Sequence, residues 1–208
     1  MKRMLFLLSG IIALLLLAGC ATFPGEKAGS ASQKDTVQVS PKSSVQSAAP
    51  TREQVRDAYA RALEAADWFR MGNMPCKGGV VALDSRQYRR VAYAGIETLD
   101  DLKNYLRGLF SEDLVEKLLA VRVDGKSPRF FSSDGRLYEL QQSLDNQETA
   151  GDARVSVKKK GSTCYEVDVE TKLLAEDRKT VIGVKYNAFS YEEKDGEWIF
   201  TNFELPNT

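Results

Sequence analysis

The sequence of 208 residues contains no histidine. This absence excludes Ser-His-Asp and Cys-His catalytic sites and zinc sites with histidine ligands, which are common centres of hydrolases. Basic and acidic side chains number 29 each, and after the first 50 residues the balance is 24 basic against 27 acidic. A domain with this charge lacks the basic surface that nucleic acids require. We therefore expect no nucleic-acid partner and no histidine-dependent enzyme.

Cysteine is scarce as well, with Cys20, Cys76 and Cys164 as the three examples. In an exported protein, the pair formed by the last two is typical of a disulfide. A reactive thiol is the alternative, but no histidine is present to activate it. We predict a Cys76–Cys164 disulfide, no catalytic residue, no metal site and no cofactor.

The apolar run near the N-terminus is short. Only 16 residues separate Arg3 from Cys20, fewer than the roughly 20 that a membrane-spanning helix needs. A basic start, a short apolar core and small residues before a cleavage point are typical of a secretory signal. Its end, Leu-Ala-Gly-Cys, resembles the bacterial lipobox, which implies cleavage before Cys20 and acylation of that residue. We expect a signal peptide over 1–19 and an extracytoplasmic protein that is lipid-anchored to a bacterial cell membrane.

Large apolar residues are almost absent from 21–50, where Ser, Ala, Gln, Lys, Gly and Pro dominate. Such a segment cannot bury enough surface to offset the entropy cost of ordering. We predict a lipidated cysteine and disordered tether over 20–50, with an r.m.s. reach of about 30 Å. The remaining residues, 51–208, are enough for a single domain.

The first half of this domain has helical patterns. Thr51 and Gln54 form a capping box before apolar residues at helical spacing, and Gly72 marks the end of a helix over about 51–71. Thr98 and Ser111 begin two further helices. Paired acids follow each of these caps, and the helix dipole explains them without any metal or acid–base role.

The second half has strand patterns and two-residue Asp-Gly turns. Alternating residues between 154 and 170 predict a hairpin in which Lys158 faces Glu166 and Arg154 faces Glu170. We interpret the acidic row Glu166, Asp168 and Glu170 as part of a solvated charge ladder, with a calcium site as the alternative. The other predicted strands cover about 78–82, 87–93, 178–191 and 197–204.

Aromatic side chains gather on the last two predicted strands. Because one face of an antiparallel sheet normally packs on the core, we expect Tyr186, Phe189, Trp198 and Phe203 to lie under a helix rather than in a ligand groove. Helices first and antiparallel strands last predict an α+β fold. Ser156-Val-Lys-Lys matches the Ser-x-x-Lys motif of penicillin-binding enzymes, but it lies on a predicted strand and lacks that family's companion motifs.

Four segments together resemble the bacterial DL-endopeptidase inhibitor family of the IseA type. They are Trp68-Phe69, Tyr88-Arg-Arg-Val-Ala-Tyr, the Thr98-Leu-Asp-Asp-Leu-Lys-Asn-Tyr-Leu helix that runs into Phe110-Ser111, and Asp134-Gly-Arg-Leu-Tyr. The likeness covers about 52–205. It implies N-terminal helices packed on a curved, cystatin-like antiparallel sheet.

The resemblance also implies a function. Members of this family inhibit NlpC-type cysteine endopeptidases, which cut the D-glutamyl to meso-diaminopimelate bond of peptidoglycan. The chain would then be a monomeric, membrane-tethered inhibitor that regulates cell-wall hydrolysis, with a cell-wall endopeptidase as its partner. A cystatin-like or nuclear-transport-factor-like envelope lipoprotein that binds a ligand or partner protein is the alternative. A hydrolase is the least favoured class, because no acid–base groups are visibly arranged.

Overall fold

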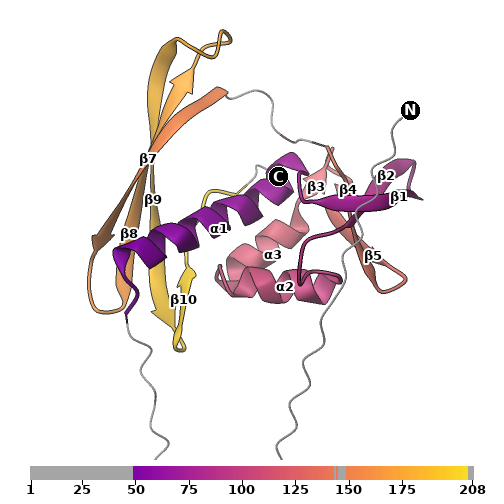
Figure 1. Ribbon diagram of the computed structural model, residues 1–208, viewed down its shortest axis with the longest axis horizontal. Coiled ribbons are helices and arrows are strands. Elements are labelled where there is room, and N and C mark those ends of the chain that lie inside the picture. Colours follow the sequence, from indigo (N-terminus) through magenta and orange to yellow (C-terminus); the bar gives the residue numbers. More distant parts are fainter. Residues whose placement is uncertain (1–48, 143, 145–148, 206–208) are drawn as a thin grey trace, which may run out of the picture. The chain divides into compact units, whose positions relative to one another are not determined.

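The structure, a computed structural model, describes residues 49–142, 144 and 149–205. The signal peptide, Cys20 and nearly all of the predicted tether lie outside these residues. The described part belongs to one compact unit, Ser44–Thr208, which contains the whole predicted domain. No helix among the described residues is long and apolar enough to cross a membrane. The arrangement of helices and antiparallel strands confirms the α+β class (Figure 1).

The first helix, α1 (Arg52–Met71), has the predicted ends. The Thr51 hydroxyl accepts a hydrogen bond from the Gln54 N–H, and the Gln54 side chain accepts one from the Thr51 N–H. At the other end Gly72 has a left-handed conformation, with φ of 62°. Glycine adopts this conformation readily because it has no Cβ.

The larger sheet has the strand order β10-β9-β8-β7 and is antiparallel throughout. The predicted registers are confirmed: Lys158 faces Glu166, Arg154 faces Glu170, and Tyr191 faces Phe200 across the Asp195-Gly196 turn. Its strands are β7 (Thr149–Lys159), β8 (Cys164–Leu174), β9 (Val181–Lys194) and β10 (Glu197–Phe200). The last strand is shorter than predicted.

A second, smaller sheet has the order β1-β2-β6-β5, and a two-stranded hairpin, β3–β4, precedes β5. The hairpin expected near 78–93 is present, with Asp84 and Ser85 at positive φ in its turn. The bounds are β1 (Cys76–Leu83), β2 (Arg86–Val91), β3 (Arg122–Val123), β4 (Ser127–Pro128), β5 (Phe130–Ser133) and β6 (Arg136–Glu139). Two short helices, α2 (Leu99–Arg107) and α3 (Glu112–Ala120), begin after Thr98 and Ser111 as predicted.

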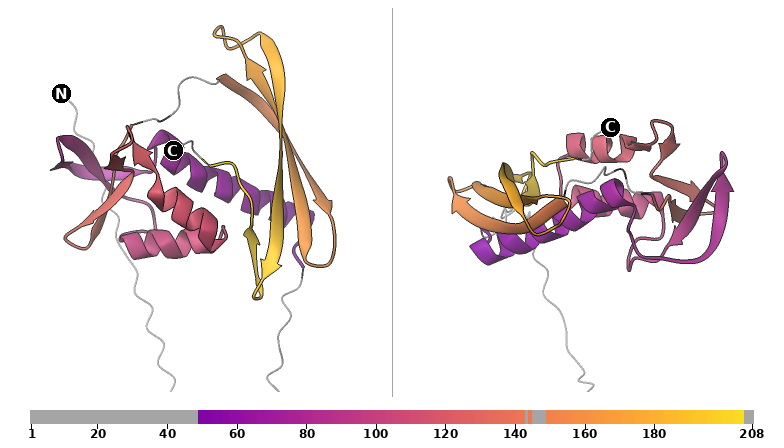
Figure 2. Two further views of the ribbon diagram at one scale, coloured as in Figure 1. Left: turned by 180° about the vertical axis from the view of Figure 1, so that it is seen from behind. Right: turned by 90° about the horizontal axis from the view of Figure 1, so that it is seen from above.

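Helix α1 connects the two sheets. It contacts β7 and β8. Figures 1 and 2 show the helix lying across the inner face of the larger sheet, with its C-terminal end at the smaller sheet. The core is built from α1, α2, α3 and this inner face, with Trp68, Phe69, Phe110 and Phe200 almost fully buried. Phe189 is buried, and Trp198 and Phe203 pack against the core, as predicted, but Phe189 and Phe203 also line the cleft described below.

Tyr186 corrects that prediction, because 72% of its surface is exposed. Successive residues of a strand point to opposite faces. Phe189 and Tyr186 are three positions apart, so they cannot share a face. The odd-numbered Phe189 faces α1, whereas Tyr186 lies on the outer face.

Candidate binding cleft

A cleft of about 620 Å³ lies between the C-terminal half of α1, the inner face of β7–β9 and the residues that follow β10. Alternation along β9 positions Lys185, Asn187 and Phe189 toward it. The chain after Phe200 leaves the sheet edge, and this brings Phe203 and Glu204 to the same space. The cleft therefore brings α1 together with the larger sheet, which comes much later in the sequence, and with the residues that follow β10.

The floor of the cleft is aromatic. Tyr59 on α1 stacks on Phe189 with 5.8 Å between ring centroids, and Phe189 stacks on Phe203 at 4.6 Å. Tyr59 and Phe189 are both buried. Aromatic rings packed in this way present a rigid apolar surface to whatever enters the cleft.

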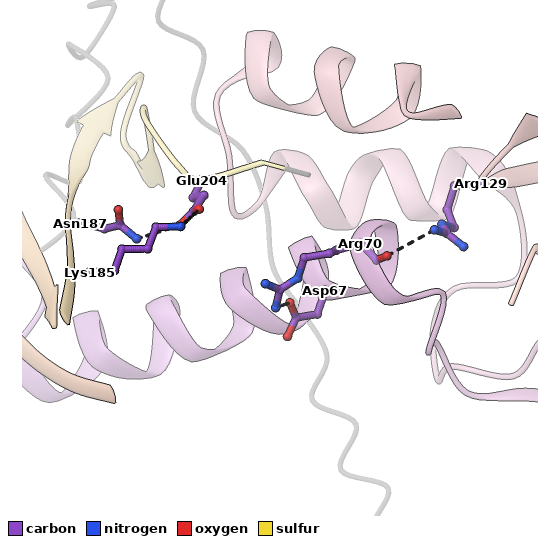
Figure 3. A network of polar contacts seen from close by, with 6 residues as sticks. All are labelled: Asp67, Arg70, Arg129, Lys185, Asn187 and Glu204. Carbon is purple, nitrogen blue, oxygen red and sulfur yellow. Dashed lines mark hydrogen bonds and ion pairs between the residues drawn. The ribbon is translucent and has the colours of Figure 1, made fainter. Parts of the chain in front are cut away.

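The rim of the cleft is charged and internally paired (Figure 3). Lys185 forms an ion pair with Glu204, and the Asn187 Nδ2 donates a hydrogen bond of 2.7 Å to the Glu204 Oε2. On the opposite wall, Arg70 pairs with Asp67. Cations and anions thus stand on both sides of an apolar floor, an arrangement suited to an extended chain of mixed polarity.

The Tyr59 hydroxyl stays protonated between these charges. Burial, and then the negative charges of Glu204 and Asp67, raise the pKa of Tyr59 to about 12. A tyrosine with this pKa is no general base near neutral pH. It contributes a neutral hydroxyl and an apolar ring.

Small side chains keep the sheet side of the cleft open. Ala150, Gly151 and Ala153 on β7 line this side. A Cβ added to Gly151 would lie 3.0 Å from the Leu174 Cγ, so a larger residue there would press on β8. A bulky side chain at exposed Ala153 would instead extend into the cleft.

Arg129 fixes the end of α1 that carries this rim. The residue is 1% exposed, and its guanidinium donates hydrogen bonds to four carbonyl oxygens, those of Phe69, Arg70, Leu140 and Gln142. The first two belong to the last turn of α1, where carbonyl groups lack helical partners. Arg129 therefore binds the end of α1 to the residues that follow β6, and Figure 3 shows its contact with Arg70.

The disulfide prediction is wrong: Cys76 and Cys164 are both free thiols. Cys76 begins β1 in the smaller sheet, whereas Cys164 begins β8 in the larger one. The Cys76 Sγ lies 3.7 Å from the Glu139 Oε2, and burial followed by this carboxyl raises the pKa of Cys76 to about 12. A thiol with this pKa is protonated and unreactive, the opposite of a catalytic cysteine.

The acidic row on β8 is a charge ladder, as predicted. The ion pairs are diagonal: Lys158 lies directly opposite Glu166 but pairs with Asp168, and Lys160 pairs with Glu166, both at 2.8 Å. The described residues hold no group of three or more His, Cys, Asp and Glu side chains placed to bind a metal ion. Ser156 lies on β7 opposite Asp168, in the strand context that separates it from the Ser-x-x-Lys enzymes.

No protein-family model and no curated protein matches this chain. The resemblance noted in the sequence therefore depends on its own four segments. Within them Trp68, Phe69, Tyr88 and Phe110 are almost fully buried, and Tyr138 is 7% exposed. The likeness accordingly concerns packing residues more than the surface that would meet an enzyme.

Sequence reasoning did not identify the cleft. Its polar residues Lys185, Asn187 and Glu204 belong to no motif, and their pairing requires the chain to turn back after β10. The only sequence signal was alternation along β9, which places Lys185 and Asn187 on one face without saying what covers it.

Proposed function

We propose that this protein is a bacterial envelope lipoprotein that acts by binding and carries out no chemistry itself. The observation that carries the proposal is the cleft between α1 and the sheet, with its aromatic floor and paired charges. Around it, the described residues provide no activated nucleophile: Tyr59 is a neutral hydroxyl, and Cys76 is a protonated thiol elsewhere in the domain. Such a lining suits an occupant that brings both apolar and charged groups.

The proposed occupant is a loop of an NlpC-type peptidoglycan endopeptidase, which the protein would inhibit. Support comes from the sequence resemblance to DL-endopeptidase inhibitors and from the lipobox, which would locate the domain beside the cell wall. The cystatin-like form of the sheet is part of the same proposal. A small envelope ligand in the same cleft is the second candidate, favoured by the size of the cavity.

An inhibition assay tests this function with a matched pair of variants. The chain from residue 20 onward, with Cys20→Ser, is mixed in excess with the endopeptidase and purified wall, and lysis is followed by turbidity. We expect at least a tenfold slower lysis. Ala153→Trp, which fills the cleft, should remove the inhibition, whereas Ala82→Trp on exposed β1 should leave it intact.

Two results would count against this reading. If no such endopeptidase from the same organism is slowed, the inhibitor function is wrong and the small-ligand alternative remains. If lysis is slowed equally by both tryptophan variants, inhibition occurs but uses another surface.

The proposed anchor has its own test. Cys20→Ala should leave an unprocessed precursor and abolish labelling by a fatty-acid analogue, because the acylated thiol would be missing. Mass measurement of the mature chain and radiolabel or click detection provide the readout. Labelling that is unchanged in this variant would contradict acylation at Cys20. With the anchor lost, inhibition in cells should weaken more than inhibition in solution, because the tether raises local concentration.

A further inference from the structure

Strand β9 is only partly covered along one edge. β10 pairs with the four residues from Tyr191 to Lys194. Beyond them, the Thr201 N–H donates to the Ser190 carbonyl, and the Asn202 side chain bonds the Ser190 N–H and the Ala188 carbonyl. The chain then turns away toward α1, so pairing along this edge stops at Ala188.

The next backbone groups on this edge belong to Tyr186 and Val184. In an antiparallel ladder, alternate residues point their N–H and C=O groups to the same side. The backbone N–H and C=O groups of Ser190 and Ala188 point toward the β10 side. The N–H and C=O groups of Tyr186 and Val184 therefore point to the same side, where the edge is open. Among the described residues, no group is hydrogen-bonded to them from that side.

This open edge is also apolar. Four large apolar residues are exposed along it: Val181 at 50%, Ile182 at 67%, Val184 at 40% and Tyr186 at 72%. Proteins usually protect such an edge with charges, proline or a covering element. The segment from Val181 to Tyr186 has one charge, Lys185, which lies on the inner face and pairs with Glu204.

We propose that a second copy of this chain binds here, with β9 of each copy pairing antiparallel about a two-fold axis at Val184. The two larger sheets then continue into one another. In this register Val184 faces its own copy, and Ile182 faces Tyr186 of the other copy. Apolar pairs of this kind stabilise neighbouring strands.

The charge of Lys185 and the small size of Gly183 favour an axis at Val184 over an axis at the next residue, Lys185. A two-fold axis at Lys185 would set two lysines directly opposite each other, which is destabilising. With the axis at Val184, Lys185 faces Gly183 of the second copy, and the glycine leaves room for the long side chain. The segment is therefore complementary to itself, which a two-fold interface requires.

The contact is small, so the dimer is expected to be weak in solution. One edge of five or six residues falls below the roughly 1,200 Å² of a stable interface. The lipid anchor of the proposed function would confine two copies to one membrane and favour their pairing. The pairing itself does not depend on that anchor, and it differs from the monomer expected from the sequence.

Sedimentation equilibrium of the Cys20→Ser chain from residue 20 onward tests the proposal between about 10 μM and 1 mM. We expect the average mass to rise toward twice that of the monomer. Tyr186→Lys should lower the association constant at least tenfold, and so should Val184→Pro. The proline removes an N–H that points to the open edge, so the ladder with β8 stays intact.

The matched control is Val80→Lys, which changes an apolar residue 53% exposed on the edge strand of the other sheet. It should leave association unchanged, and thermal melting should show that all three variants fold. A wild-type chain that stays monomeric up to 1 mM would overturn the proposal, and so would variants that associate as strongly as the wild type. The lysis assay, with its cleft variants, fails or succeeds independently of this result.

Discussion

Arg129→Met is expected to lower the free energy of unfolding by about 3–5 kcal/mol, the largest effect that we predict for a single side chain. Methionine fills similar space but donates no hydrogen bond, so four carbonyl oxygens would each lose the hydrogen bond from Arg129, and of these at least the Leu140 oxygen would keep its bond from the Gln142 N–H. The C-terminal end of α1 would also lose a cation beside its negative dipole end. Urea unfolding measures the change.

Arg129→Lys separates the effect of the positive charge from the effect of the hydrogen bonds. A lysine keeps the positive charge but cannot reproduce the planar fork of donors, so we expect it to recover only part of the loss. Arg56→Met on the exposed face of α1 is the control and should change stability by less than about 0.5 kcal/mol. A loss in Arg129→Met no greater than in this control would show that Arg129 does not hold the helix end.

Glu139→Gln is expected to remove a pH dependence of stability. Glu139 is fully buried, and its Oε1 accepts a hydrogen bond of 3.1 Å from the Met74 N–H. Burial raises the pKa of Glu139 to about 7, although the Met74 bond and the charge of Arg129 act in the opposite direction. An ordinary glutamate has a pKa near 4.3, so the folded protein binds this proton more tightly than the unfolded chain.

The sign of the effect follows from this difference. The protonated Glu139 side chain contributes its full stabilisation below about pH 4.3. This contribution is lost as the pH rises through about 7, because the unfolded chain releases the Glu139 proton at a lower pH than the folded protein does. Over this window we expect the free energy of unfolding to fall by about 3 kcal/mol in the wild type. The variant, whose amide is neutral throughout, should lack this contribution.

The measurement compares urea unfolding of the wild type and Glu139→Gln at pH 5, 6, 7 and 8, so that other carboxylates cancel. The ionisable groups next to Glu139, Cys76 and Arg129, do not titrate between pH 5 and 8 and so do not contribute to the difference. The pKa of Cys76 is about 12, and Arg129 stays charged in this range. Parallel stability curves for the two proteins across this window would contradict a raised pKa at Glu139.

Much of the fold was readable from short stretches of sequence. The capping box at Thr51 and Gln54 and the glycine at 72 determine where α1 begins and ends. Asp195 and Gly196 both adopt positive φ, as a two-residue hairpin turn requires, and this turn sets the register of β9 and β10. These features were predictable because each depends on residues within a few positions of one another.

The partners of buried polar groups were decided only by the tertiary structure. Nothing near Arg129 in the sequence indicates that its guanidinium binds the end of a helix 60 residues earlier. In the sequence, Glu139 looks like a glutamate on the exposed face of a strand, yet in the structure it is fully buried beside Cys76. A disulfide was predicted because an exported domain with an even number of cysteines often contains one. A disulfide also needs two thiols side by side, and Cys76 and Cys164 begin strands of different sheets.

The sequence by itself determined the helix ends and the registers of the β7–β8 and β9–β10 hairpins, whereas the tertiary structure decided the pairing of the other strands and which faces are covered. Alternation assigns Tyr186 and Phe189 to opposite faces of β9, but it does not say which face α1 will cover. Likewise, the strand pattern does not show that pairing with β10 stops at Phe200 and leaves Val184 on an open edge. Local backbone preferences act over a few residues, whereas covering a face requires an element from elsewhere in the chain. For this reason the cleft and the open edge could be identified only from the tertiary structure.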